Sequence, residues 1–143
     1  MTAKEYLQQL HKLTVTIEQR KQEKADLRES LYNISGIDYS KERVRGSSPA
    51  GSNHERVMVK LIELENKIDI LVGEQIELKD KIIGQIHELD NPNQINVLYK
   101  RYVLFEKIEQ IADDLGFSYR NIYRLHDHGL EEFEKIHLGN SEC

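Results

Sequence analysis

Residues 108–133 read IEQIADDLGFSYRNIYRLHDHGLEEF, and this stretch decides the fold of the C-terminal part of the chain. Apolar residues recur at helical spacing on both sides of Gly116 and Phe117. Gly116 admits the positive φ of a tight turn, Phe117 can fill the corner, and Ser118 is a residue type that caps helix starts. The stretch therefore predicts a helix-turn-helix motif whose second helix begins after Ser118.

The same spacing predicts which residues of the motif face inward and which face outward. Ala112 is small where the two helices would cross, and four larger apolar residues are expected between them: Ile111, Leu115, Ile122 and Leu125. Arg and Asn side chains can pair with guanine and adenine edges, and Tyr hydroxyls suit phosphates. We therefore predict an interface with double-stranded DNA that is formed by Ser118, Tyr119, Arg120, Asn121, Tyr123 and Arg124, with Lys100 and Arg101 nearby.

Upstream of this motif, Asp90-Asn91-Pro92 ends one helix and begins another, because Pro is tolerated only in a first helical turn. The apolar face of the new helix consists of Leu98, Tyr99, Tyr102 and Val103. The sequence thus predicts a trihelical domain over residues 91–137 and a flexible tail over residues 138–143. Gly129 is unusual in its third helix, where it costs about 1 kcal/mol relative to Ala.

Residues 1–90 carry two heptad patterns, which predict two long helices over about 2–34 and 53–89. The first pattern is Ala3, Tyr6, Leu10, Leu13, Ile17, Arg20, Lys24, Leu27, Leu31 and Ile34. The second is Val57, Leu61, Leu64, Ile68, Leu71, Gln75, Leu78, Ile82, Gln85 and Leu89. The similar lengths favour an antiparallel hairpin, with Ser52 and Glu55 as a capping box and residues 35–52 as a solvated loop carrying Lys41, Arg43 and Arg45.

Two features of the long helices bear on their partners. Arg20 and Lys24 interrupt the first apolar pattern, and Glu63 and Glu65 are expected nearby in an antiparallel register. The second helix also carries apolar residues beyond its heptad pattern, and a hairpin would leave them partly exposed: Ile62, Val72, Ile76, Ile83 and Ile86. An exposed apolar row usually marks an interface, so the sequence predicts a homodimer through the long helices.

Composition excludes several classes of function. The net charge of −5 argues against a protein that coats nucleic acid regardless of its sequence. Residues 91–143 also hold six Lys and Arg against nine Asp and Glu. Any contact with DNA must therefore come from a local basic patch. The single cysteine, Cys143, allows no intramolecular disulfide, and no stretch has the length of a signal peptide core or membrane span, which predicts a cytoplasmic protein. His126 and His128 lack metal-ligand spacing, and no nucleotide loop or nucleophile with its base is present. We therefore expect no metal, no cofactor and no enzymatic activity.

The run LYKRYVLFEKIEQIADDLGFSYRNIYRLHDHGLEEF resembles sigma-factor region 4, and more closely the sigma-region-4-like, ArpU-like regulators encoded by phages of Gram-positive bacteria. The resemblance rests on Leu98-Tyr99, Arg101-Tyr102, Ile111-Ala112, Leu115-Gly116-Phe117-Ser118 and Tyr123-Arg124-Leu125-His126. It implies that residues 119–121, 123 and 124 face a promoter's upstream hexamer and that the domain docks on RNA polymerase. The chain departs from this family at Phe105-Glu106-Lys107, where Ser or Thr is usual.

These observations favour a phage or prophage transcriptional regulator that works in the bacterial host's cytoplasm. Two alternatives remain open from the sequence. A small terminase-like DNA-packaging protein also combines a helix-turn-helix with coiled-coil oligomerisation. A protein interaction module would use the trihelical domain as a scaffold without binding DNA.

Overall fold

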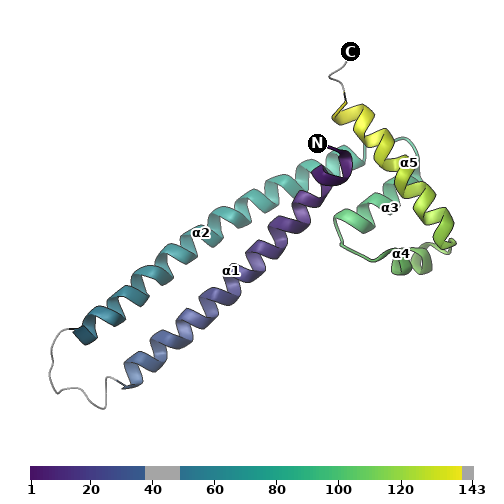
Figure 1. Cartoon of the computed structure of the whole chain (residues 1–143). Coiled ribbons are helices and arrows are strands. Elements are labelled where there is room, and N and C mark those ends of the chain that lie inside the picture. The colour runs from purple at the N-terminus through teal and green to yellow at the C-terminus, as the bar shows by residue number, and fades with distance from the viewer. Residues whose placement is uncertain (38–48, 140–143) are drawn as a thin grey trace. The chain divides into compact units, whose positions relative to one another are not determined.

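The computed structural model describes residues 1–37 and 49–139, and every regular element in these ranges is an α-helix. The helices are α1 (Ala3–Ile37), α2 (Pro49–Ile86), α3 (Pro92–Tyr102), α4 (Ile108–Leu115) and α5 (Tyr119–His137), labelled in Figure 1. The fold is therefore all-α, as the sequence predicts. None of the described helices has an apolar stretch of the length needed to cross a membrane.

The chain divides into two compact units, and the long helices contribute to both. The two-helix unit comprises residues 15–73, and the five-helix unit comprises residues 1–14 and 74–143. The five-helix unit thus contains the first turns of α1 and the last turns of α2 together with α3, α4 and α5. The domain boundary predicted near residue 90 lies inside the five-helix unit, because the ends of α1 and α2 share a core with the following helices.

The main core of the five-helix unit joins α1, α2, α3 and α5. Its buried members are Ala3, Leu7, Leu10, Ile82, Ile86, Leu89, Leu98, Tyr102, Val103 and Phe133. Two hydrogen bonds link α1 to α2 beside this core: the Tyr6 hydroxyl donates to Gln85 Oε1 over 2.8 Å, and Gln75 Nε2 donates to Thr14 Oγ1 over 2.9 Å. Ile86 is fully buried in this core, which corrects the prediction that it would be partly exposed.

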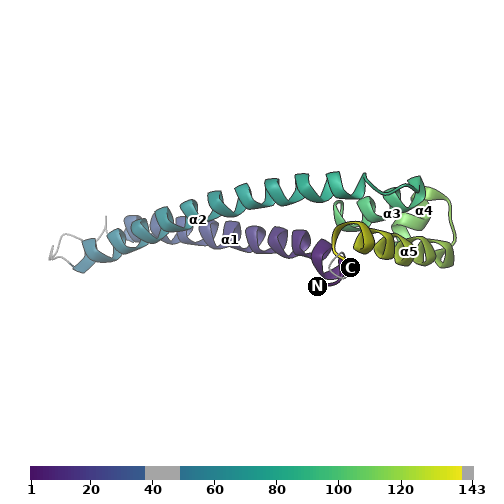
Figure 2. The same ribbon diagram turned by 90° about the horizontal axis from the view of Figure 1, so that it is seen from above.

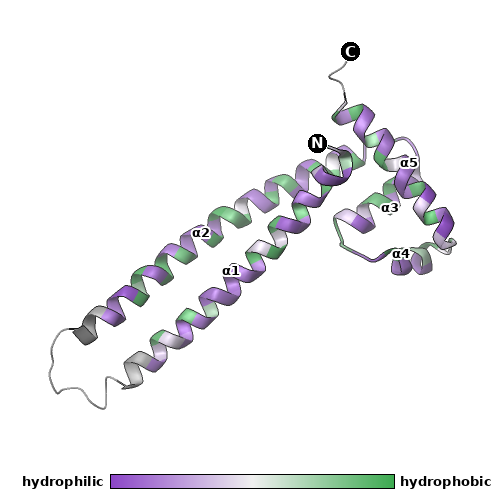
Figure 3. Cartoon of the chain, viewed as in Figure 1, coloured by the Kyte–Doolittle hydropathy of each residue, from purple (hydrophilic) through white to green (hydrophobic). Residues whose placement is uncertain are grey.

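In the two-helix unit, α1 and α2 run in opposite directions (Figures 1 and 2). The apolar contact is small, with Ile17, Leu61, Leu64 and Ile68 as the buried residues of this unit among those described. Figure 3 shows that α2 is richer in hydrophobic residues than α1.

The two cations of the first heptad pattern, Arg20 and Lys24, both form ion pairs, and so does Arg28 beside them. Lys24 and Arg28 both pair with Glu65, at 3.6 and 3.1 Å, as expected for Lys24. Arg20 instead pairs with Glu23 on its own helix at 2.9 Å. Glu63 is exposed and is recorded in no ion pair within the described residues, so its predicted role beside Arg20 and Lys24 is wrong. It lies two positions before Glu65, which turns its side chain to the other side of α2.

The last turn of α1 and the first turn of α2 both extend further than predicted. Helix α1 continues to Ile37, and α2 begins at Pro49, where Pro fits a first helical turn. Ser52 therefore lies inside α2 and is not its N-cap, so the predicted capping box is wrong. Lys41, Arg43, Arg45 and Cys143 lie outside the described residues. At its other end α2 stops at Ile86, three residues before the predicted limit, and a turn follows in which the Leu89 amide donates to the Ile86 carbonyl.

Helix α3 begins as predicted, because Asn91 and Pro92 provide its cap and first turn. The Asn91 side-chain oxygen accepts from the amide of Asn93 at 2.8 Å and from that of Gln94 at 3.4 Å. Helix α3 packs against α5 at Gly129, where a Cβ atom would lie 3.3 Å from Leu98 Cδ1 and 3.4 Å from Gln94 Cβ. The close approach of the two helices accounts for a glycine in the middle of α5.

Candidate nucleic-acid interface

The turn between α4 and α5 has the geometry that its sequence predicts. Gly116 adopts a left-handed conformation with φ 72° and ψ 30° and ends α4. The Ala112 carbonyl accepts from the amides of Gly116 at 2.9 Å and Phe117 at 3.1 Å. Ser118 then caps α5, because its Oγ accepts from the Asn121 amide at 3.1 Å. The start of α4 has no such cap, and Lys107 makes no side-chain hydrogen bond to it.

A second, smaller hydrophobic core lies between α4, α5 and α3. Val97, Ile111, Ala112, Ile122 and Leu125 are buried there, with Ile108, Leu115 and Phe117 packed against them. Three of the four predicted core residues are therefore confirmed as buried. Leu115 is only half-buried, because it lies in the last turn of α4, where the helix ends at Gly116. This core fixes which side of α5 is left to solvent.

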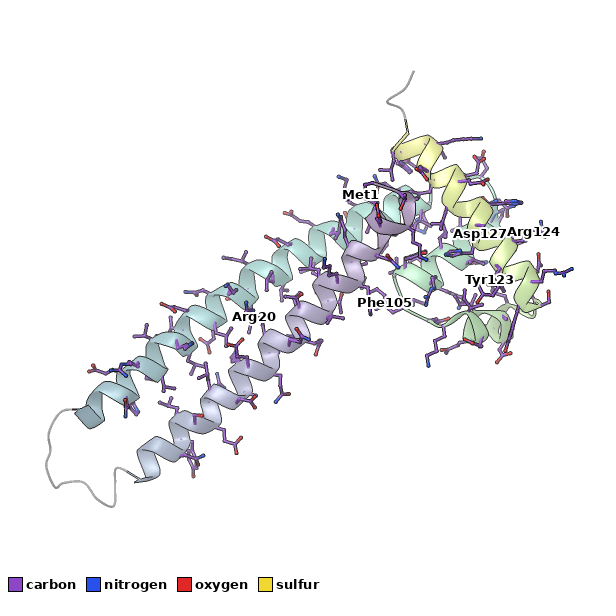
Figure 4. The ribbon with its side chains drawn as sticks, in the orientation of Figure 1. Met1, Arg20, Phe105, Tyr123, Arg124 and Asp127 are labelled. Carbon is purple, nitrogen blue, oxygen red and sulfur yellow. The ribbon has the colours of Figure 1, made fainter. Side chains whose placement is uncertain are left out.

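The predicted contact residues in α5 occupy its first two turns. Tyr119 and Tyr123 are each 53% exposed, and Arg120 and Arg124 are exposed as well. Asn121 is half-buried, and its Oδ1 accepts from Arg124 Nη2 at 2.5 Å. Figure 4 shows Tyr123 and Arg124 on α5. Two guanidinium groups and two phenols thus line one short solvent-facing segment.

Lys100 and Arg101 are placed differently from the residues of α5. The Lys100 ammonium lies 3.5 Å from Asp114 Oδ2 and 4.0 Å from Glu106 Oε1, and only a quarter of its side chain is exposed. Arg101 Nη1 donates to the Glu106 carbonyl at 2.9 Å. Both cations therefore hold the segment between α3 and α4, in which Phe105 has a positive φ of 59°. The structure does not bring their charges to the exposed segment with Arg120 and Arg124.

The charge on the solvent-facing side of α5 changes sign after the second turn. Asp127 and Glu131 follow Arg120 and Arg124 at helical spacing, and all four are exposed. Figure 4 labels Arg124 and Asp127 along α5. Because phosphates repel carboxylates, this pattern favours an anion at the amino-terminal end of α5 and disfavours one beside its later turns.

A hydrogen-bonded chain of three side chains crosses from α3 to α5. The Asp127 carboxylate lies 3.1 Å from His126 Nδ1 and can only accept, so Nδ1 carries a proton. In the neutral ring, His126 Nε2 then accepts from the Tyr102 hydroxyl at 2.8 Å. Burial raises the pKa of Tyr102 to about 12, and the Asp127 charge adds to the shift against the opposing effect of Arg101. Residues 24 positions apart form this contact, and no periodicity in the sequence predicts it.

Lys107 is not among the residues that the sequence predicts to contact DNA, yet it is exposed at the start of α4. The first amides of a helix carry partial positive charge, so a lysine at this point adds to a position that favours phosphate. Its place directly before the apolar pattern that begins at Ile108 was the signal available for it.

The histidines do not form a metal site within the described part of the chain, where no group of three or more potential ligands is found. His126 is engaged by Tyr102 and Asp127, and His128 is exposed. Three further histidines contact aromatic rings within the five-helix unit: His11 meets Phe105 edge-on, His87 stacks on Tyr99, and His137 lies tilted against Phe133.

Comparisons with known proteins place the chain in a family without assigning its activity. No curated protein and no solved structure matches the chain. A family model described as "Protein of unknown function (DUF1492)" matches residues 33–134, a range that includes α2, α3, α4 and nearly all of α5. Because this match covers well over half of the 143 residues, the chain belongs to the DUF1492 family.

Proposed function

We propose that this chain is a phage or prophage transcriptional regulator that binds promoter DNA through α4 and α5, used as a helix-turn-helix of the sigma region-4 type. The observation that carries the proposal is the group of exposed residues Tyr119, Arg120, Tyr123 and Arg124, which begins a capped helix directly after a left-handed glycine turn. In helix-turn-helix proteins the first residues of the second helix contact base edges. Arg120 and Arg124 are the residues for direct reading, and Tyr119 and Tyr123 suit phosphates or thymine methyl groups.

The charge pattern of α5 supports local binding by its amino-terminal end. Arg120 and Arg124 stand free of acidic partners in the described structure, while Asp127 and Glu131 begin the acidic part. A few cations give modest and salt-sensitive affinity, so a dimer that presents two such helices binds more tightly than one chain. The proposal therefore includes a homodimer through the long helices. It also includes docking on RNA polymerase, which the resemblance to region 4 implies, and action in the host cytoplasm without a catalytic step.

The proposal is tested first by selection from a pool of random-sequence duplexes at low salt, followed by anisotropy titration of the selected duplex. Arg120→Ala and Arg124→Ala should each weaken binding by about 1–3 kcal/mol if they read bases. Lys135→Ala is the matched control, because Lys135 is an exposed cation in the last turn of the same helix. It should leave the affinity nearly unchanged.

The outcomes separate the competing functions. If no duplex is enriched at low salt, DNA binding is excluded and an interaction module is favoured. If duplexes bind with no sequence preference and Lys135→Ala weakens binding as much as Arg120→Ala does, the helix reads no bases and the regulator is ruled out. A ring-shaped oligomer that selects DNA would instead favour a packaging protein.

A further inference from the structure

The side of α2 that faces away from its buried residues carries an exposed apolar stripe in the two-helix unit. Val59, Ile62 and Ile70 are 55%, 51% and 63% exposed, and a side chain at Gly73 would meet no atom within 4 Å. With Asn66 they form the outer stripe, defined as Val59, Ile62, Asn66, Ile70 and Gly73. The intervals of three and four residues put all five on one face of the helix.

The two-helix unit has too little core to leave this stripe exposed without cost. Among its described residues four apolar side chains are buried, and α1 also presents Lys24 and Arg28, whose charges reach Glu65 of α2. Helices of this kind gain most of their stability from packing an apolar face. A second apolar face on the same helix, turned to solvent, is typical of a contact with another chain.

The outer stripe is symmetric about Asn66. Ile62 and Ile70 lie four residues before and after it, and Val59 and Gly73 lie seven before and after it. If two copies of α2 cross antiparallel on a two-fold axis at Asn66, Ile62 lies level with Ile70 of the second copy. Val59 then lies level with the second copy's Gly73, so that a branched side chain meets open space.

Two residues on one flank of the stripe have charges that fit this arrangement. Glu63 and Lys67 lie on one flank, both are exposed, and no ion pair is recorded for either within the described residues. The two-fold axis brings Glu63 level with Asp69 of the second copy, which lies on the opposite flank of the helix. On the flank that Glu63 occupies, the second copy's Lys67 lies two positions away, an offset of about 3 Å along the helix axis. The reciprocal pair forms on the other side of the axis. A parallel pairing would instead set Gly73 against Gly73 and leave a gap.

We propose that a second copy of this chain covers the outer stripe, with the two α2 helices antiparallel and their two-fold axis at Asn66. This inference adds to the homodimer of the proposed function the surface, the direction and the register of the contact between the two chains. All three are argued from residues of α2 alone. A single polar Asn within an otherwise apolar helix contact sets register at some cost in stability, and Asn66 meets its own copy here.

Disulfide cross-linking of the full chain tests the direction and the register together. In a Cys143→Ser background, Asn66→Cys should cross-link to itself under mild oxidation, because a two-fold axis brings identical residues together. Ile62→Cys and Ile70→Cys should not link when each is alone, but should link when the two proteins are mixed. Self-linking of Ile62→Cys as efficient as that of Asn66→Cys would overturn the antiparallel register.

Charge exchange gives a second test that does not depend on thiols. Glu63→Lys and Lys67→Glu should each raise the dimer dissociation constant about tenfold in analytical ultracentrifugation, since each creates two like-charge contacts. The double exchange should restore dimerisation. Double-exchange protein that stays as weak as the single variants would overturn the proposed contact, and circular dichroism checks that the helices remain intact.

The remaining outcomes separate this inference from the proposed function. Ile62→Lys should abolish the dimer while leaving each chain folded. If this variant loses tight DNA binding but keeps the same sequence preference, both proposals stand. A wild-type chain that is monomeric at tens of micromolar and still selects a DNA sequence overturns the dimer alone. A dimer with the predicted cross-links that selects no DNA overturns the proposed function alone.

Discussion

The hydroxyl of Tyr102 in α3 lies 2.8 Å from Nε2 of His126 in α5, and the two rings stack with centroids 5.7 Å apart. This contact joins the helix that precedes the proposed DNA-binding motif to its second helix. His126 makes this contact from the side of α5 that packs toward α3. The position of α5 is therefore sensitive to the ionisation of Tyr102.

Alkaline pH should destabilise the five-helix unit through Tyr102. The folded-state pKa is raised from 10.0 to about 12, so the folded chain holds this proton more tightly than the unfolded chain. The contribution is fully present below pH 10 and is lost as pH rises from 10 to 12, by roughly 2–3 kcal/mol in all. Urea unfolding across this range measures it. Tyr102→Phe should flatten the decline, whereas Tyr119→Phe, at an exposed residue, should leave it in place.

Truncation of the small core under α4 and α5 should have a graded effect. Ile111 is fully buried, so Ile111→Ala should cost about 2–5 kcal/mol. Leu115 is half-buried, so Leu115→Ala should cost clearly less. Thermal melts of both variants would decide the point. Equal losses, or a larger loss at Leu115, would mean that the ends of α4 are placed wrongly.

The two helical glycines Gly129 and Gly84 should respond differently to alanine. A Cβ at Gly84 meets no atom within 4 Å, so Gly84→Ala should stabilise the chain by about 0.5–1 kcal/mol through helix propensity. At Gly129 the new methyl group would press on buried Leu98 at 3.3 Å, which offsets that gain. We expect no stabilisation from Gly129→Ala in denaturant unfolding. A gain as large as that at Gly84 would contradict the close packing of α3 and α5.

Salt dependence should distinguish the free cations from the engaged ones. Removing one phosphate-contacting cation lowers the slope of log affinity against log salt by about 1. If Arg120 contacts phosphate, Arg120→Ala should produce this change. Lys100→Ala should not, because Lys100 is already paired with Asp114 and Glu106. Titrations at several salt concentrations measure both slopes, and a lowered slope for Lys100→Ala would place that residue at the interface.

Much of the local structure followed from the sequence alone. Gly116 and Ser118 determined the turn and the start of α5, and Asn91 with Pro92 determined the start of α3, because caps and turns depend on a few neighbouring residues. Helical periodicity also identified Ile111, Ile122 and Leu125 as core, since a residue's side of a helix is set by counting along it.

Only the tertiary structure decided which helix faces meet. In the folded chain Ile86 is buried in the same core as Phe133, and Glu63 faces away from the cations of α1. Lys100 and Arg101 both contact Glu106 in the segment between α3 and α4. The tertiary structure also joined Tyr102 to His126 and explained Gly129 by the approach of Leu98. Such contacts depend on the distance between helices that are far apart in sequence, and a helical period specifies the direction of a side chain but not the partner that it reaches.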